Sequence, residues 1–382
     1  TQEPTNAQTK PATVSRKNIE ITDQNELKFN LFAPFANQVF IAGWDIMSYY
    51  GKTKSGQKPF RGIPMQKTEN GYWSINLGKP PAEPLQYFYW IDSVRTVDPE
   101  NAQILSTANQ PLSVADLVCL DSANIFCPKA VPRGMVVNVF YYSNQLNKLR
   151  PLSIYLPPDY FTATKAYPVL YLLHGAGEIA TSWVNAGKAN IVADNLLASG
   201  KMLPTIIVMP LGHPIGEGDV LPSAGSSINR QPWFEKELTD EIIPWIEKNF
   251  RTKNNKADRA LAGLSMGGAQ SIYTACRNPG LFNYVYILSA GDQHFEVNQA
   301  AFLANARQTG SPFKKLFLGV GNLDKVGKNE TNPGVYDNML SMHNLLTRYN
   351  IVHDLKILPD TDHTWYAWRN FLANDVLPTL WK

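Results

Sequence analysis

The apolar positions of the chain follow two patterns, one in each half. From about Asn18 to Ser122, short runs alternate apolar and polar residues between turn residues, as in LKFNLFAP, QVFIAGW, GYWSINLG and LQYFYWID. Period-two alternation in short, regularly spaced runs is typical of half-buried strands in a β-sandwich. We therefore predict an all-β, immunoglobulin-like sandwich over residues 18–126.

The second half, after the Pro-marked stretch CPKAVPRG at 127–134, places continuous apolar runs between amphipathic segments. The runs predicted as strands are LSIYL (152–156), VLYLL (169–173), TIIVM (205–209), RALA (259–262), VYILS (285–289), KLFLGV (315–320) and HDLKIL (353–358). Strands that alternate with helices form a mostly parallel sheet with helices on both faces. We predict such a domain over residues 127–382.

One amphipathic segment, EKELTDEIIPWIEKNF, has apolar residues every four positions. Leu238, Ile242, Ile246 and Phe250 share one face of the predicted helix. Pro244 lies inside this segment, lacks an N–H and clashes with the preceding turn, so the helix must kink or restart there.

Composition narrows the function classes. The chain of 382 residues is 44% hydrophobic and 18% charged, and no apolar run approaches the roughly 18 residues of a membrane helix. A net charge of +3 without a basic block predicts neither nucleic-acid nor membrane partners. The polar segment 1–17, which starts at Thr1 without Met, is expected to be a disordered tail left by a cleaved signal peptide, which implies a secreted or periplasmic protein.

Three cysteines, Cys119, Cys127 and Cys276, do not form a disulfide framework, and their odd number leaves at least one thiol free. A bridge between Cys119 and Cys127 and three small buried side chains both remain open.

Candidate chemistry centres on Ser265 in GLSMGG. The pattern Gly263-Leu264-Ser265-Met266-Gly267 follows the predicted strand RALA and precedes the predicted helix AQSIYTACRNP, which ends by Pro279. Strand, sharp turn and helix are the context of the nucleophile elbow of an α/β-hydrolase, in which small residues let the strand and helix backbones approach. Ser265 is therefore the predicted nucleophile.

A serine nucleophile needs a base and an acid. Of the six histidines, His363 follows the last predicted strand, in the loop PDTDHTW, where α/β sheets place functional loops. Asp324 follows the strand KLFLGV, which gives the order Ser265, Asp324, His363 expected of this fold. The rival acids are Asp337, Asp354, Asp360 and Asp362.

The turn Leu173-His174-Gly175-Ala176-Gly177 closes another predicted strand with small residues. We expect the backbone N–H groups of Ala176 and Met266 to form the oxyanion hole, since two such donors stabilise a tetrahedral intermediate.

With these motifs, YLLHGAGEIATSW, GLSMGG, the Asp324 loop and DHTWYAWRNFL, residues 130–382 resemble carbohydrate esterase family 1, within the putative-esterase group of α/β-hydrolases. This family includes bacterial feruloyl esterases and acetyl xylan esterases, and the resemblance implies catalysis by Ser265, Asp324 and His363 without metal or cofactor. Thr361-Asp362 stands where the family often has Gly-Gly. The N-terminal half, through FAPFANQVFIAG, NGYWSINLG, YFYWID and VDPEN, resembles carbohydrate-binding module family 48, with Trp44, Trp73 and Trp90 as candidate sugar-stacking rings.

The resemblance predicts feruloyl esterase activity on feruloylated xylan and its oligosaccharides. Acetyl xylan esterase, iron-siderophore esterase and a non-catalytic carbohydrate-binding protein are the alternatives. Trp183, Trp233 and Trp365 lie near the predicted cleft and are candidate walls for a planar acyl group, with core packing as the alternative reading for each.

Overall fold

The computed structural model describes residues 17–51, 61–215 and 232–382. The predicted tail 1–17 lies outside these residues except for Lys17. The chain divides into two compact units, Thr1–Pro81 with Tyr87–Gln103, and Ala82–Gln86 with Ile104–Lys382. Each unit is described by itself.

The first unit is built from antiparallel strands, as the alternating pattern predicts. Its first sheet has the order β1-β2-β6-β5, and in its second sheet β3 pairs with β4 and β7, and β7 with β8. Phe29 of β2 contacts Tyr87 of β7 with ring centroids 4.9 Å apart, so the two sheets share an aromatic core. The immunoglobulin-like topology stays a prediction. The elements are β1 (Ile19–Ile21), β2 (Leu27–Phe32), β3 (Val39–Ala42), α1 (Trp44–Tyr50), β4 (Ile63–Pro64), β5 (Gln66–Lys67), η1 (Glu69–Gly71), β6 (Tyr72–Asn76), β7 (Pro84–Ile91) and β8 (Val94–Thr96).

The second unit contains an eight-stranded sheet in the order β11-β12-β14-β13-β15-β16-β17-β18. The strands from β14 to β18 run parallel to one another, whereas β11 and β12 form an antiparallel hairpin at one edge. The mostly parallel sheet is as predicted, and β11 is an addition. The strands are β11 (Met135–Ser143), β12 (Lys148–Leu156), β13 (Val169–Leu173), β14 (Ile206–Pro210), β15 (Arg259–Leu264), β16 (Tyr284–Leu288), β17 (Lys315–Gly321) and β18 (Asp354–Leu358).

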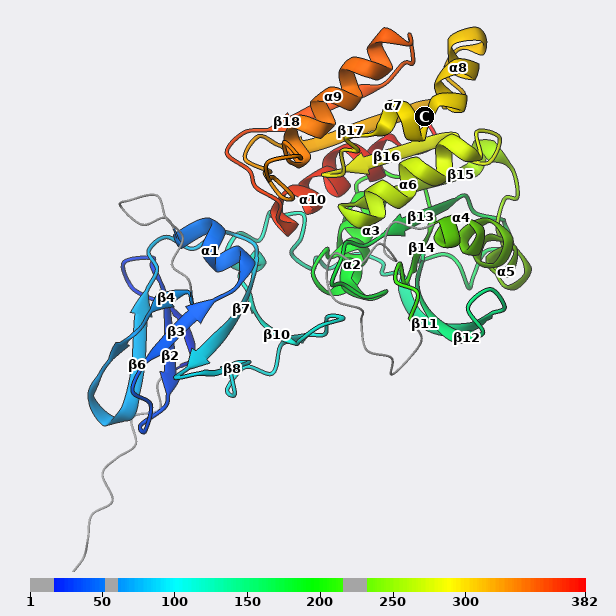
Figure 1. The fold of residues 1–382 in the computed structure, drawn as a ribbon. Helices are drawn as coiled ribbons and strands as arrows, with labels where there is room; N and C mark the ends of the chain where they lie inside the picture. Colours follow the sequence, from blue (N-terminus) through cyan, green and yellow to red (C-terminus); the bar gives the residue numbers. More distant parts are fainter. Residues whose placement is uncertain (1–16, 52–60, 216–231) are drawn as a thin grey trace, which may run out of the picture. The chain divides into compact units, whose positions relative to one another are not determined.

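Helices cover both faces of this sheet (Figure 1). Alternate residues of β13 explain the two cores: Tyr171 and Leu173 belong to one hydrophobic cluster, and Leu170 and Leu172 belong to the other. On the first face lie α4 (Pro232–Lys236), η4 (Glu237–Ile242), α5 (Ile243–Asn249), α6 (Met266–Arg277), α7 (Phe295–Asn298), α8 (Ala300–Thr309) and α9 (Val335–Arg348). On the second lie α2 (Ser182–Asn185), α3 (Ala189–Ala198), α10 (Trp365–Phe371), η6 (Leu372–Val376) and η7 (Leu377–Thr379), while η5 (Lys256–Asp258) precedes β15.

The segment 237–250 continues through Pro244 as one helical path. Leu238, Ile242 and Ile246 are fully buried on the predicted face. A π-helical turn, η4, precedes α5, and Pro244 stands in the first turn of α5. There its missing N–H costs no α-helical bond, so the helix restarts rather than breaks.

The boundary between the units falls earlier in the chain than the predicted position 126/127. Residues from Ile104 onward group with the sheet, because Leu105, Val118 and Phe126 pack in its second hydrophobic cluster. This segment holds β9 (Ile104–Leu105), β10 (Leu112–Asp116) and η2 (Val118–Leu120). Cys119 and Cys127 form a disulfide with Cα atoms 5.1 Å apart, and Cys276 is free and buried.

Candidate active site

Ser265 lies in a sharp turn between β15 and α6. Its φ of 50° and ψ of −118° are unusual for a residue with a Cβ, and its N–H donates to the Leu288 carbonyl at 2.8 Å. A Cβ on Gly263 would lie 2.3 Å from the Gly267 backbone, and one on Gly267 would lie 2.5 Å from the His174 carbonyl. Only glycine lets these three segments approach so closely, and the turn thereby holds Ser265 at the N-terminus of α6.

Three side chains from three loops meet at this point. Ser265 Oγ lies 2.9 Å from His363 Nε2, and His363 Nδ1 lies 2.8 Å from Asp324 Oδ2. Asp324 is fully buried, and His363 is 9% exposed. Since a carboxylate only accepts, Nδ1–H donates to Asp324, which leaves Nε2 as the acceptor for the serine hydroxyl. The arrangement is that of a nucleophile, a base and an orienting acid.

The rival aspartates have other positions. Asp362 Oδ1 accepts the backbone N–H of His363 at 2.8 Å and so supports the loop rather than the imidazole. Asp354 forms an ion pair with Lys315, and Asp337 lies in the first turn of α9. Asp360 has a positive φ of 50° in the turn that follows β18. Of the five aspartates considered, Asp324 is the one whose carboxylate contacts the His363 ring.

The turn after β13 lies against the start of α6. Gly175 N–H donates to Glu178 Oε2 at 3.1 Å, and the Gly177 carbonyl accepts the N–H of Ala108 at 2.9 Å. Between these two anchored residues, the Ala176 N–H has no protein acceptor among the residues that the structure describes. Met266 is the first residue of α6, where a helix leaves its N–H groups without intrahelical partners. Within the described residues, both predicted oxyanion donors are therefore backbone N–H groups without a protein acceptor.

The three tryptophans predicted near the cleft differ in burial. Trp183 is fully buried, donates from Nε1 to the Leu173 carbonyl at 3.0 Å and packs edge-on against Trp365, which is 3% exposed. Both rings belong to the core between α2 and α10, which argues against the predicted contact with a substrate. Trp233 is partly buried at the start of α4 and packs beside the first core.

Several residues that shape this region carry no motif recognisable in the sequence. Glu178 orders the turn after β13 by accepting the N–H of Gly175. The sequence feature that could have indicated this role is a carboxylate three residues after that glycine. Ala108 contacts the turn from the loop between β9 and β10, a contact between distant segments that leaves no local signature. Trp368 packs edge-on against the His363 ring with centroids 4.9 Å apart.

Within the described ranges, no cluster of three or more His, Cys, Asp or Glu side chains has the arrangement of a metal site. No helix in those ranges is long and apolar enough to cross a membrane.

Comparison with known proteins places this geometry in a family. Residues 143–379 match the family described as "Putative esterase". An endo-1,4-beta-xylanase/feruloyl esterase of Xylanibacter ruminicola is 35% identical over 235 residues, which are 60% of this chain and 32% of that protein. Esterase Rv1288 of Mycobacterium tuberculosis is 35% identical over 131 residues, 34% of this chain and 27% of that protein. The chain thus spans about a third or less of the length of these relatives.

Among solved structures, a ferulic acid esterase of carbohydrate esterase family 1 from the anaerobic fungus Anaeromyces mucronatus has 25% identity and a TM-score of 0.58. The match covers 67% of this chain and 93% of that one. Residues 143–379 include the strands from β12 to β18 and the loops that hold Ser265, Asp324 and His363. The chain belongs to the family described as "Putative esterase", whose model covers residues 143–379, and is a carboxylic ester hydrolase.

Proposed function

We propose that Ser265, His363 and Asp324 hydrolyse feruloyl esters of xylan. The observation that carries this proposal is the hydrogen-bonded sequence from Asp324 through His363 to Ser265 Oγ. A carboxylate, an imidazole and a hydroxyl in this order are the components of a serine esterase.

The acylation step follows from these contacts. His363 Nε2 takes the proton of Ser265 Oγ as the oxygen attacks the ester carbonyl carbon. The C=O electron pair moves to the carbonyl oxygen, whose negative charge is bound by the N–H groups of Ala176 and Met266. The tetrahedral intermediate then collapses, the bond to the alcohol oxygen breaks, and His363 gives that oxygen its proton. The sugar leaves as an alcohol, and the acyl group remains on Ser265.

Deacylation repeats the same steps with water. His363 removes a proton from a water molecule that attacks the acyl-enzyme carbonyl, and the proton passes to Ser265 Oγ as the acid is released. Asp324 stays ionised throughout and stabilises the imidazolium that forms twice in each cycle.

The feruloyl preference is supported by the relatives. The Xylanibacter ruminicola protein is named a xylanase/feruloyl esterase, and the Anaeromyces mucronatus structure is a ferulic acid esterase. Xylan-type esters are therefore the substrate class that we propose for this chain.

The test compares ferulate release from methyl ferulate and from feruloylated arabinoxylan with acetate release from acetylated xylan and with hydrolysis of a catecholate trilactone. We expect ferulate release to dominate. Acetate release alone, or turnover of the trilactone alone, would refute the feruloyl assignment while leaving the serine esterase chemistry intact.

The serine assignment has its own test. Ser265→Ala should lower kcat on every ester to near the background rate, whereas the fold, monitored by thermal unfolding, should be unchanged. Full turnover by Ser265→Ala would overturn the proposed site.

We further propose that the first unit binds the polysaccharide and that the protein works outside the cytoplasm. Trp44 is 53% exposed, whereas Trp73 is 6% exposed and donates from Nε1 to the Ala33 carbonyl, so Trp44 is the better candidate for stacking on a sugar ring. The Cys119–Cys127 disulfide supports an oxidising compartment. Retention of Trp44→Ala on insoluble xylan, compared with the unchanged chain, tests the binding. Equal retention would exclude Trp44.

A further inference from the structure

The loop that follows β14, residues 211–215, lies beside His174 and the side chain of Met266, which belong to the two segments that carry the predicted oxyanion donors. A Cβ on Gly212 would lie 3.1 Å from the Met266 Cε atom and 3.6 Å from His174 Cε1. Gly212 is buried at this point, between the turn after β13 and the first turns of α6.

Both polar backbone groups of Gly212 are bonded to side chains. Its N–H donates to His174 Nε2 at 2.9 Å, and its carbonyl accepts Gln270 Nε2 at 2.9 Å. His174 lies two residues before Ala176 in the turn after β13, and Gln270 lies one turn beyond Met266 in α6. A single backbone segment thus joins the two segments that carry the donors.

The tautomer of His174 follows from these contacts. Because an N–H can only donate, Nε2 accepts from Gly212 and carries no proton, so Nδ1–H donates to the Gly175 carbonyl at 2.8 Å. Burial, together with the nearby His213 and Arg150, lowers the pKa of His174 to about 3. The ring is therefore neutral at neutral pH and holds Gly175 and Gly212 at fixed separation.

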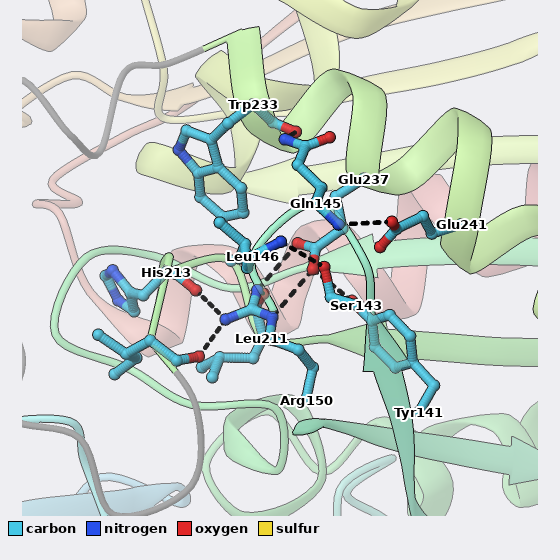
Figure 2. Close-up of polar contacts among 12 residues, drawn as sticks. Tyr141, Ser143, Gln145, Leu146, Arg150, Leu211, His213, Trp233, Glu237 and Glu241 are labelled. Carbon is cyan, nitrogen blue, oxygen red and sulfur yellow. Dashed lines mark hydrogen bonds and ion pairs between the residues drawn. The ribbon is translucent and has the colours of Figure 1, made fainter. Parts of the chain in front are cut away.

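A buried ion pair between Arg150 and Glu237 also holds this loop (Figure 2). Arg150 of β12 is fully buried and donates through Nη2 to the Leu211 carbonyl at 2.7 Å, and through Nη1 to the carbonyls of His213 and Ile215. Its Nε and Nη2 bond both carboxylate oxygens of Glu237, at 3.0 and 2.9 Å.

Glu237 is itself fully bonded. Tyr141 donates its hydroxyl to Glu237 Oε1 at 2.6 Å, which adds a third hydrogen bond to the carboxylate. Removing both charges from water costs free energy that offsets their attraction, so the ion pair contributes little to the free energy of unfolding. The pair fixes the loop on both sides of Gly212, because one guanidinium binds the carbonyl of Leu211 before it and those of His213 and Ile215 after it.

We propose that the Gly212 bridge, meaning the Gly212 backbone with its bonds to His174 and Gln270, sets the position of the oxyanion hole. The Arg150–Glu237 pair holds this bridge, and Gln270, His174 and Arg150 are positioning residues. None of them contacts the reacting atoms. They fix where the N–H groups of Ala176 and Met266 stand relative to Ser265. This inference rests on the proposed site.

The bond to Gln270 can be removed with little change of shape. Gln270→Met keeps the length of the side chain but loses the donor to the Gly212 carbonyl. We expect kcat for methyl ferulate to fall about 10- to 100-fold, less than the about hundred- to thousandfold cost of losing a whole oxyanion donor. KM should stay within about twofold, because the carbonyl oxygen of the bound ester interacts only weakly with the two N–H donors before it becomes negatively charged. The Ki of phenylboronic acid, which forms a tetrahedral adduct on serine, should rise in parallel with the loss of kcat/KM.

Asn195→Leu is the matched control. Asn195 is also a buried amide, and its Nδ2 donates to the carbonyls of Ile125 and Cys127, away from the oxyanion turn. It should lower thermal stability about as much as Gln270→Met does and leave kcat near the wild-type value. Equal effects of both variants on kcat, or an unchanged kcat in Gln270→Met, would overturn the inference. An active Ser265→Ala would instead overturn the proposed site itself.

The ion pair is tested by replacing both partners, so that neither charge is left buried alone. Arg150→Met with Glu237→Met should lower kcat with little change in KM. The control is Arg259→Met with Glu247→Met, a pair joined at 2.5 Å at the start of β15, whose opposite end leads to Ser265. If the two double variants have equal kcat while both remain folded, Arg150 does not act on the oxyanion hole.

Discussion

Two aspartates contact His363 in different ways. Asp324 accepts from the ring at Nδ1, whereas Asp362 accepts from the backbone N–H of His363. An amide at either position keeps the shape of the side chain, but at Asp324 it replaces the carboxylate that is hydrogen-bonded to the imidazole.

Asp324→Asn should lower kcat by about 10³- to 10⁴-fold, because an amide N–H facing Nδ1 favours the tautomer whose Nε2 carries the proton and no longer accepts from Ser265. Steady-state kinetics on methyl ferulate measures the loss, and unfolding in urea checks that the fold is kept.

Asp362→Asn is the matched control, since an asparagine oxygen can still accept the backbone N–H. Its kcat should stay within about tenfold of the wild-type value. Comparable losses in the two variants would show that the acid role is not confined to Asp324.

At this scale the sequence identifies the groups whose roles follow from a local motif. Ser265, His363 and Asp324 each follow a strand, so their meeting could be predicted from chain order. Trp183 and Trp365 could not be placed, because their burial depends on how α2 and α10 pack together. The Gly212 bridge joins residues far apart in the chain, and no local pattern marks it.

The elbow is an arrangement of elements as much as of residues. β13, β15 and α6 come together so closely that Gly267 fits against the backbone of Leu173 and His174. Within a helix, alanine is normally more stabilising than glycine by about 1 kcal/mol. Whether replacing Gly267 by alanine raises or lowers the free energy of unfolding therefore depends on whether the steric clash outweighs that gain.

Gly267→Ala should be destabilising by about 1–3 kcal/mol, because its Cβ would lie 2.5 Å from the His174 carbonyl oxygen, and backbone cannot move aside cheaply. Urea unfolding measures the change in the free energy of unfolding.

Gly280→Ala provides the comparison, since a Cβ there would have no neighbour within 4 Å. It should change the free energy of unfolding by less than about 0.5 kcal/mol. A neutral Gly267→Ala would mean that the elbow relaxes more easily than its contacts indicate.

In the second unit, the strands with continuous apolar runs were predicted, whereas β11, which has no such run, was missed. VLYLL became β13 with the predicted bounds, because it is buried on both faces. MVVNVFYYS, which forms β11, is an edge strand with exposed Met135, Phe140 and Tyr142, and no helix separates it from β12. The predicted pattern, in which each strand is followed by a helix, therefore did not include β11. The π-helical turn before Pro244 likewise has no local signal beyond the proline.

Acid stability is a property of the whole molecule, to which the buried His174 contributes. Burial holds its pKa at about 3 in the folded protein, below the ordinary value of 6.5. The unfolded chain therefore binds a proton that the folded one excludes. Above about pH 6.5 the histidine is neutral in both states and the folded protein keeps its full free energy of unfolding. As the pH falls from 6.5 towards 3, protonation of His174 in the unfolded chain lowers that free energy.

His174→Phe should flatten this dependence. Between about pH 7 and about pH 5 the wild-type free energy of unfolding should fall more than that of the variant, although at pH 7 the variant is the less stable because Gly212 N–H loses its acceptor. Urea unfolding at both pH values measures the two slopes. Parallel slopes would show that His174 is protonated without cost.

The division of the chain limits how this protein can be recombined. The path passes between the two compact units at Pro81/Ala82, Gln86/Tyr87 and Gln103/Ile104. A single crossover at 126/127 would part Cys119 from Cys127 and Asp116 from Lys188, its ion-pair partner at 2.6 Å. The esterase unit is therefore no simple cassette. A chimera that transplants it must carry residues from Ile104 onward, and also Glu83, which forms a buried ion pair with Arg369 of α10.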